Sequence, residues 1–190
     1  MSASTRHVHY TYAEYASLEE ESSIRHEYLD GEIYAIAGGT PDHAALAAAV
    51  IGLLRSVIPQ SCRTFTSDLR VRTSSGLTTY PDAAVVCGKT TRAADDPISV
   101  TNPCLLVEVT SPSTEDYDRG EKVRHYKSLP SVQEILIVSH REARLTIHRR
   151  NNTGSWSTGE VNTGDSVELA SVAATLAVGD VYRGGLEDAI

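Results

Sequence analysis

A single acidic residue stands inside the most strand-like segment of the chain, and it restricts how that segment can fold. Residues 104–109 read CLLVEV, a short apolar run with turn-forming residues on both sides, which predicts a buried strand. Glu108 interrupts this run. Burying an ionised carboxylate costs several kcal/mol unless a cation or hydrogen-bond donors meet it. The fold must therefore bring such a partner to Glu108.

Two neighbouring segments offer groups that could meet this carboxylate. Asp82 follows a proline and directly precedes a second apolar strand, and residues 119–128 predict a helix. On that helix Arg119, Lys122 and Tyr126 are spaced as on one face. Two carboxylates and a lysine, supplied by two strands and a helix, are the components of a divalent-metal site for phosphodiester hydrolysis.

Length and composition predict one mixed α/β domain. The chain has 190 residues, with a flexible N-terminal tail expected over residues 1–10 and a single domain over 11–190. The net charge of −8 argues against broad, nonspecific adhesion to nucleic acid. Eight of the 17 Lys and Arg residues nevertheless lie between Arg119 and Arg150, so a local basic face is compatible with the sequence.

The cysteines and the apolar segments favour a cytoplasmic protein. Cys62, Cys87 and Cys104 form no CxxC pair and lie in apolar segments, which predicts buried, reduced side chains. The N-terminus has no apolar stretch typical of a signal peptide. The longest apolar run, residues 44–54, is too short to span a bilayer, so no membrane association is expected.

Local signals locate most of the elements. Thr11 and Glu14 form a capping box for a helix over 12–20, and Asp30-Gly31 marks a hairpin turn. Thr40 begins a second helix, which is apolar on nearly all sides and is expected to lie inside, against a sheet. Residues 89–103 predict a surface loop. Strands are predicted at 24–29, 32–37, 62–66, 69–73, 83–87, 104–109, 134–139, 144–149, 155–161 and 166–169.

An ordered set of short motifs resembles a known family. The motifs are E-Y-L-D-G-E, a histidine (His43) at a helix start, S-D-L-R-V, Y-P-D, L-V-E-V-T-S-P-S-T and D-x-x-x-K-x-x-x-Y. From about Thr11 to Tyr182 the chain resembles the Uma-two family of restriction-endonuclease-like proteins, within the PD-(D/E)XK nuclease superfamily. The resemblance implies a central mixed β-sheet flanked by helices, with extra β-hairpins. It also implies a Mg²⁺ site, which Mn²⁺ can fill, a DNA substrate and no organic cofactor.

The resemblance assigns roles to four residues. Asp82 matches the aspartate of the PD motif, Glu108 the acid of the (D/E)XK motif, and Glu27 an upstream glutamate of the family, all three as metal ligands. Thr110 stands where the motif lysine is expected, on the same strand face as Glu108. The resemblance implies that Lys122, from the following helix, supplies the catalytic amine instead.

Structural interpretations of the two central acids stay open at this point. Asp82 suits a turn after proline as well as it suits a metal. The alternative for Glu108 is a buried ion pair with an arginine such as Arg70 or Arg72.

The other candidates have alternatives of the same kind. Lys122 lies four residues after Asp118 and could form an ordinary surface ion pair with it. Glu27 either completes the metal ligands or is a solvated residue of a hairpin. His43 either contacts a phosphate or is structural, and Tyr126 is explained by core packing.

Two hypotheses of function follow. The first is a metal-dependent endonuclease that hydrolyses phosphodiester bonds in DNA and acts as a homodimer. The second is a nuclease-fold module with weak or lost catalysis that binds DNA or a protein, which the net charge and Thr110 favour.

Overall fold

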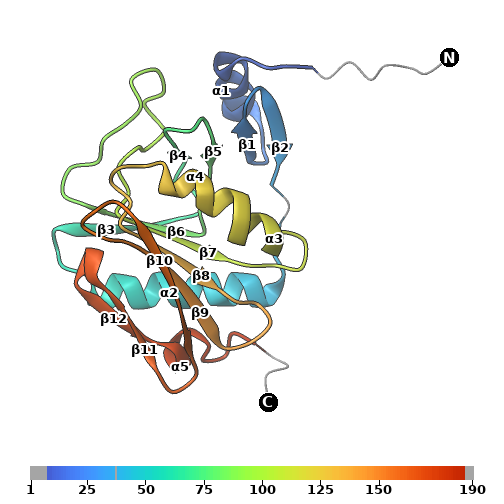
Figure 1. Cartoon of the computed structure of the whole chain (residues 1–190). Coiled ribbons are helices and arrows are strands. Elements are labelled where there is room, and N and C mark those ends of the chain that lie inside the picture. The colour runs from blue at the N-terminus through green and yellow to red at the C-terminus, as the bar shows by residue number, and fades with distance from the viewer. Residues whose placement is uncertain (1–7, 37, 187–190) are drawn as a thin grey trace.

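A six-stranded mixed sheet forms the centre of the molecule (Figure 1). The computed structural model describes residues 8–36 and 38–186. The strand order is β10-β9-β8-β7-β6-β3, in which β7 and β8 are parallel and the other neighbours are antiparallel. The strands are β3 (Cys62–Thr66), β6 (Ala83–Cys87), β7 (Leu105–Val109), β8 (Glu134–Val138), β9 (Arg144–Arg150) and β10 (Trp156–Asn162).

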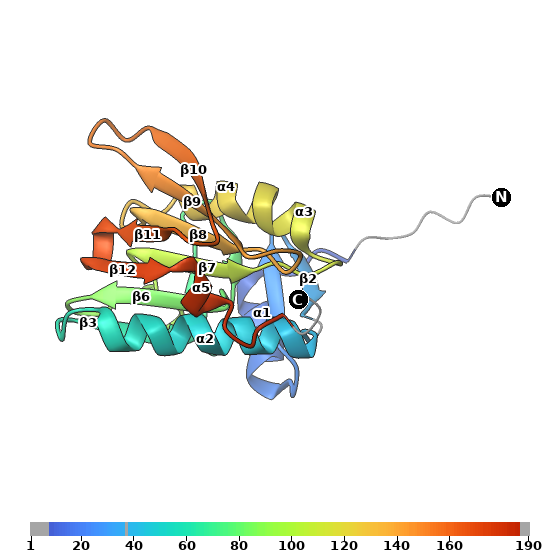
Figure 2. The same cartoon turned by 90° about the horizontal axis from the view of Figure 1, so that it is seen from below.

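Helices cover both faces of this sheet, which confirms the predicted fold class (Figure 2). One face packs against α2 (Pro41–Val57) and a C-terminal unit made of β11 (Ser166–Leu169), η2 (Ala170–Val172), β12 (Ala174–Ala177) and α5 (Val178–Val181). The other face carries α3 (Glu115–Tyr117), η1 (Asp118–Lys122) and α4 (Val123–Lys127). Strand alternation divides β7 between the two cores, with Val107 toward α2 and Leu106 toward α4.

A second, smaller sheet stands beside the first. Its order is β2-β1-β5-β4, with β1 (His26–Leu29), β2 (Glu32–Ala35), β4 (Val71–Arg72) and β5 (Thr78–Thr79). The helix α1 (Tyr12–Glu21) precedes it and starts at the predicted capping box. Asp30 and Gly31 both have positive φ, 48° and 88°, as the hairpin turn between β1 and β2 requires. Tyr10, at the end of the expected tail, donates its backbone N–H to Gly31.

Two helical predictions need correction. The helix α2 does pack on the sheet, but it is buried only along the stripe Leu46, Val50 and Leu54, while Ala44 and Ala48 are exposed. Alanine side chains are small enough to face solvent at little cost, so an alanine-rich helix need not lie inside. The helix predicted at 119–128 is interrupted, because a π-helical turn (η1) precedes α4.

The cysteine prediction is also wrong in part. Cys62 and Cys87 are directly opposite each other on β3 and β6 and form a disulfide. Cys104 is the free thiol, with its Sγ 3.6 Å from Sγ of Cys87. Apolar flanking residues indicated burial but carried no information on strand register, which decides the pairing. Within residues 8–36 and 38–186, no helix is long and apolar enough to cross a membrane.

Candidate active site

Glu108 projects from the centre of the sheet toward the helical segment η1–α4. The residues of β7 are buried, and the side chain of Glu108 is 3% exposed. Oε1 of Glu108 lies 3.1 Å from Nζ of Lys122 and accepts a hydrogen bond from the Tyr126 hydroxyl. The buried carboxylate therefore meets both a cation and a donor, as its position required.

The amine of Lys122 is buried among carboxylates. Its side chain is 8% exposed, and Nζ lies 3.2 Å from Oε1 of Glu27 and 3.8 Å from Oδ1 of Asp118. Burial acts to lower the pKa of Lys122, but Glu108 and its other neighbours outweigh burial and raise that pKa well above its ordinary value. Lys122 is therefore a fixed positive charge, and the interpretation as a surface ion pair is wrong.

Both oxygens of Glu27 have partners within the protein. Oε1 faces Lys122 and also accepts a hydrogen bond from the Thr79 hydroxyl, while Oε2 accepts one from the Tyr117 hydroxyl at 3.1 Å. Glu27 is buried, so it is not a solvated residue on the outside of the hairpin. Its contacts fix the position of the Lys122 amine.

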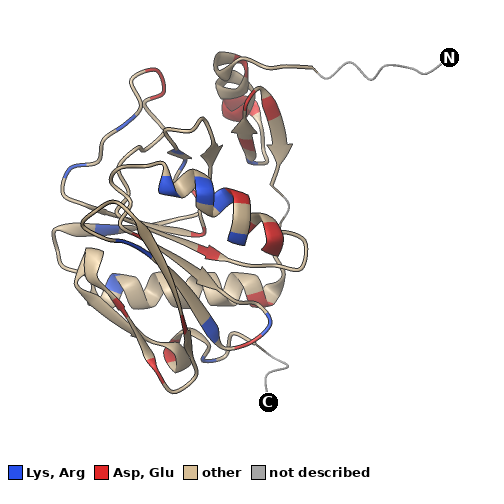
Figure 3. Ribbon diagram, viewed as in Figure 1, with Lys and Arg blue, Asp and Glu red and all other residues tan. Residues whose placement is uncertain are grey.

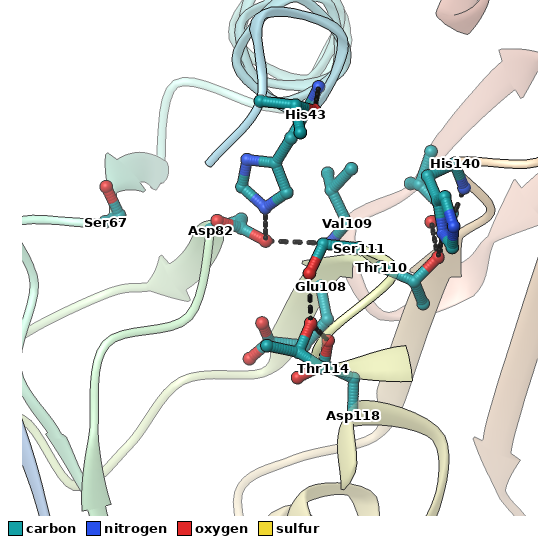
Figure 4. A network of polar contacts seen from close by, with 12 residues as sticks. His43, Ser67, Asp82, Glu108, Val109, Thr110, Ser111, Thr114, Asp118 and His140 are labelled. Carbon is teal, nitrogen blue, oxygen red and sulfur yellow. Dashed lines mark hydrogen bonds and ion pairs between the residues drawn. The ribbon is translucent and has the colours of Figure 1, made fainter. Parts of the chain in front are cut away.

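Asp82 is held at the end of β7 by the backbone of that strand and by a histidine of α2. Its Oδ2 accepts a hydrogen bond from the backbone N–H of Val109 at 2.7 Å and lies 3.3 Å from Nε2 of His43 (Figure 4). The contact with Asp82 raises the pKa of His43, against the opposing effect of burial. His43 is placed by the first turn of α2, where the Thr40 side chain accepts its backbone N–H.

Asp118 belongs to the same cluster, although sequence reasoning treated it only as a partner for Lys122. It is buried, and its Oδ2 accepts a hydrogen bond from Thr114 at 2.6 Å. Burial raises its pKa, although Lys122 opposes this. Its signal in the sequence is the D-x-x-x-K spacing, which says that the two residues are neighbours but not that they are buried.

Acids outnumber cations in this cluster. Glu27, Glu108 and Asp118 surround the amine of Lys122. Asp82 adds a fourth carboxylate beside His43, which is a second cation only when protonated. Burial raises the pKa of Glu108 well above its ordinary value, and the nearby charges of Asp82 and Asp118 add to this effect, whereas Lys122 opposes it. A cluster with surplus buried negative charge takes up protons or a cation.

Thr110 does not share the surroundings of Glu108, which corrects the prediction from strand alternation. It lies just past the end of β7, where its hydroxyl donates to the backbone carbonyl of Val138 at 3.3 Å. The same oxygen lies 2.8 Å from Nδ1 of His140 (Figure 4). The side chain is directed toward β8 because the regular alternation stops where the strand stops.

Other contacts separate the remaining candidates. Arg70 pairs with Asp96 at 3.2 Å and Arg72 with Asp95 at 2.6 Å, so neither arginine is the partner of Glu108. Arg119 was predicted to share a helix face with Lys122 and Tyr126, but it does not contact the acidic cluster. Its Nε lies 3.1 Å from Glu115 and its Nη1 donates to Thr146 on β9. The π-helical turn contains more residues than an α turn and so changes which side chains share a face.

The donor set fits a hard divalent cation held by few protein ligands. Within the described part of the chain, no three His, Cys, Asp or Glu side chains are grouped as a metal cage. Mg²⁺ is usually bound through one or two carboxylates and keeps several waters, so it does not need such a cage. Among the described residues, Asp82 and Glu108 each contact the protein through one carboxylate oxygen, Oδ2 and Oε1. Both oxygens of Glu27, in contrast, have partners, namely Lys122, Thr79 and Tyr117.

The fold and the buried acids at the end of the sheet define a restriction-endonuclease-like protein. A crystal structure from Anabaena variabilis, described as a "putative nuclease", is similar with a TM-score of 0.74 at 21% identity. The likeness covers 92% of this chain and 98% of that one.

Sequence comparison gives the family directly. The model of the Uma2 family, described as "Putative restriction endonuclease", matches residues 12–179, and this chain belongs to that family. "Uncharacterized protein slr1290" of Synechocystis is 36% identical over 173 residues, which are 90% of each chain. "Uncharacterized protein sll1609" of the same organism is 29% identical over 161 residues, covering 84% of this chain and 90% of that protein. The predicted family is thereby confirmed.

Proposed function

We propose that this protein is a metal-dependent endonuclease that hydrolyses phosphodiester bonds in DNA. The observation that carries the proposal is the contact of 3.1 Å between Lys122 Nζ and Glu108 Oε1 in a cluster of four acids, of which Glu27, Glu108 and Asp118 are buried. An ion pair that served only stability would need one carboxylate. Surplus acids beside a fixed amine are what a cation and an attacked phosphate require.

Each residue of the cluster has a role in this proposal. Asp82 and Glu108 hold Mg²⁺, which when bound supplies Lewis-acid polarisation of the phosphate and a more acidic water. Lys122 orients the attacking water and stabilises negative charge that develops on the phosphorus oxygens. Glu27 keeps the amine in place. Tyr126 fixes the carboxylate of Glu108 through its hydroxyl.

The test is cleavage of supercoiled plasmid DNA with Mg²⁺, with Mn²⁺ and with EDTA. Activity is expected with either metal, none is expected with EDTA, and Asp82→Asn should be inactive. Single-stranded DNA and RNA as alternative substrates define the preferred nucleic acid. Failure to cut any of these with either metal, together with absence of Mn²⁺ binding in calorimetry, would reject the proposal.

A second candidate, a catalytically inactive binding module, is favoured by one observation. Thr110 replaces the motif lysine, and its hydroxyl is committed to His140 and to the carbonyl of Val138. A thermal melt separates the two candidates, because a metal that binds the folded state raises the melting temperature. Stabilisation by millimolar Mn²⁺ that Asp82→Asn loses favours the enzyme. A melt that Mn²⁺ leaves unchanged favours the module.

We also propose a homodimer, since enzymes that cut both strands of a two-fold symmetric target commonly act as dimers. Light scattering after size-exclusion chromatography measures the mass directly. One chain is 20.5 kDa, so a dimer should give a measured mass of about twice that value.

A further inference from the structure

A groove lined by cations runs along β3, one of the two edge strands of the central sheet. It consists of two adjoining cavities, of about 990 and 480 Å³, which share Arg63 and Phe65 as lining residues. The larger cavity adds Lys89, Arg92 and Ile98, and the smaller adds Arg55 from the last turn of α2. These six residues define what is called here the basic groove. In Figure 3 basic positions lie on β3, at the end of α2 and on the loop after β6, at the left of the view.

The charge of the basic groove is uncompensated. No acidic residue lines either cavity. The acids of the flanking loops instead pair with arginines outside the groove, namely Asp68 with Arg25, Asp95 with Arg72 and Asp96 with Arg70. Among the ion pairs within residues 8–36 and 38–186, none involves Arg55, Arg63, Lys89 or Arg92. On a chain of net charge −8, such a concentration of cations favours an anionic ligand.

The floor of the groove is apolar and includes an aromatic ring. Phe65 is half-buried, and Ile98 is 50% exposed on the opposite loop. The guanidinium of Arg63 lies 5.1 Å from the centroid of the Phe65 ring and donates a hydrogen bond to Thr90. An apolar surface with an aromatic ring and a cationic rim is the combination that binds unpaired nucleic-acid strands, because bases stack while phosphates meet the cations. A phosphate or sulfate ion alone would make no use of the ring.

Phe65 projects from the same face of the sheet as Glu108, whereas Arg55 belongs to α2, which covers the opposite face. Phe65 pairs with Ala84, which pairs with Leu106, and Glu108 follows two residues later on β7. Paired residues and residues two apart project from one face, so Phe65 and Glu108 do so as well. Strand spacing and rise separate them by roughly 12 Å. Ala84 and Leu106, which lie between them, are fully buried, so a nucleic-acid strand can contact both only by passing over the residues that cover this face.

We propose that the basic groove binds a single-stranded segment of nucleic acid, with phosphates at the four cations and a base against Phe65. The inference deepens the proposed function, on which it rests: the segment held in the groove belongs to the strand presented to the acids. A base pair in a duplex buries both faces of each base by stacking, so the ring of Phe65 selects an unpaired region.

The test is fluorescence anisotropy of a labelled 20-nucleotide oligo(dT), titrated in EDTA at several salt concentrations. Arg63→Gln, Lys89→Gln and Arg92→Gln should each reduce the slope of log affinity against log salt by about 0.7, the value for one lost phosphate contact on a single strand. Arg183→Gln is the matched control, since Arg183 is an exposed arginine outside the groove. Phe65→Leu keeps an apolar side chain and should weaken binding about tenfold with the slope unchanged.

Three outcomes would overturn the proposal. The parent protein binds no oligo(dT), the groove variants match Arg183→Gln in affinity and slope, or a polyglutamate peptide of equal charge competes as well as the oligonucleotide. The last result would identify the groove as a surface for an acidic protein.

The design keeps this proposal separate from the proposed function. Because binding is measured in EDTA, it does not depend on cleavage. Binding that responds to the groove variants in a protein that cuts no substrate with any metal would reject the nuclease alone. Cleavage by a protein whose groove variants bind like the control would reject the groove alone.

Discussion

Lys122 places its ammonium 3.1 Å from the carboxylate of Glu108, at a point in the chain where a π-helical turn ends and α4 begins. The two residues are 14 positions apart and come from a helix and from the central strand. The π turn is a feature often found at functional sites.

Replacing Lys122 by methionine should remove the amine while leaving the metal ligands in place. We expect cleavage to fall on the order of 10²-fold, the scale for losing one preorganised charge stabiliser. Affinity for Mn²⁺ should be unchanged or higher, because a competing cation is gone. Initial rates on plasmid and calorimetry with Mn²⁺ measure the two effects, and Lys127→Met, on the adjoining helix α4, is the control. If Lys122→Met cuts at the parent rate, the amine has no part in catalysis.

Adding Thr110→Lys to the Lys122→Met variant should not restore cleavage. The strand pattern suggested that residue 110 reaches the acids, but its side chain is directed toward His140 and Val138. A lysine there would lose both contacts and point away from Glu108. Plasmid cleavage by the double variant at more than a tenth of the parent rate would contradict this placement.

Asp82→Asn should abolish metal binding and leave the fold intact. The amide oxygen of asparagine can still accept the backbone N–H of Val109. The substitution also removes one negative charge from a cluster in which the carboxylates repel one another. We expect the metal-free variant to be as stable as the parent or more so in urea unfolding. Asp95→Asn, which removes an exposed carboxylate, is the matched control. Mn²⁺ bound by Asp82→Asn with parental affinity would show that Asp82 is not a ligand.

Glu27→Gln distinguishes a metal ligand from a residue that positions Lys122. If Glu27 positions the amine, Mn²⁺ affinity should stay within about threefold. Cleavage should fall about tenfold, which corresponds to about 1.4 kcal/mol of lost transition-state stabilisation. Glu27→Asp, which keeps the charge, should recover part of the rate. A large loss of Mn²⁺ affinity in calorimetry would instead return Glu27 to the metal ligands that the family resemblance implied.

His148 should make the protein less stable in acid. Burial, with Lys127 and Arg119 nearby, lowers its pKa to about 4, below its ordinary value of 6.5. The folded state then binds fewer protons than the unfolded state between these values. The stability that His148 contributes is therefore complete above pH 6.5 and is lost as pH falls toward 4.

Urea unfolding at pH 7 and pH 4.5 measures this loss. The contribution of His148 should be on the order of 2 kcal/mol. His148→Gln can still hydrogen-bond to Thr158 but does not titrate, so its stability should fall less than that of the parent. An equal fall in both proteins would mean that other groups account for the acid sensitivity.

Local chemistry in the sequence determined much of the fold. The capping box of Thr11 and Glu14, the Asp30-Gly31 turn and the apolar run around Glu108 each depend on residues close together in the chain. Such signals can be read without knowing the rest of the molecule. They gave α1, the β1–β2 hairpin and β7, and an out-of-place carboxylate indicated where a cation must be.

Only the tertiary structure decided how distant segments meet. The strand register that pairs Cys62 with Cys87, the turn of Thr110 toward β8 and the burial of Asp118 all depend on pairings between remote elements. The two-residue strand β5 was too short to give a pattern, whereas β4 lies within the strand predicted at 69–73. The π turn that carries Lys122 could not be read from the sequence, because π-helical turns are rare and local helical spacing predicts an unbroken α-helix.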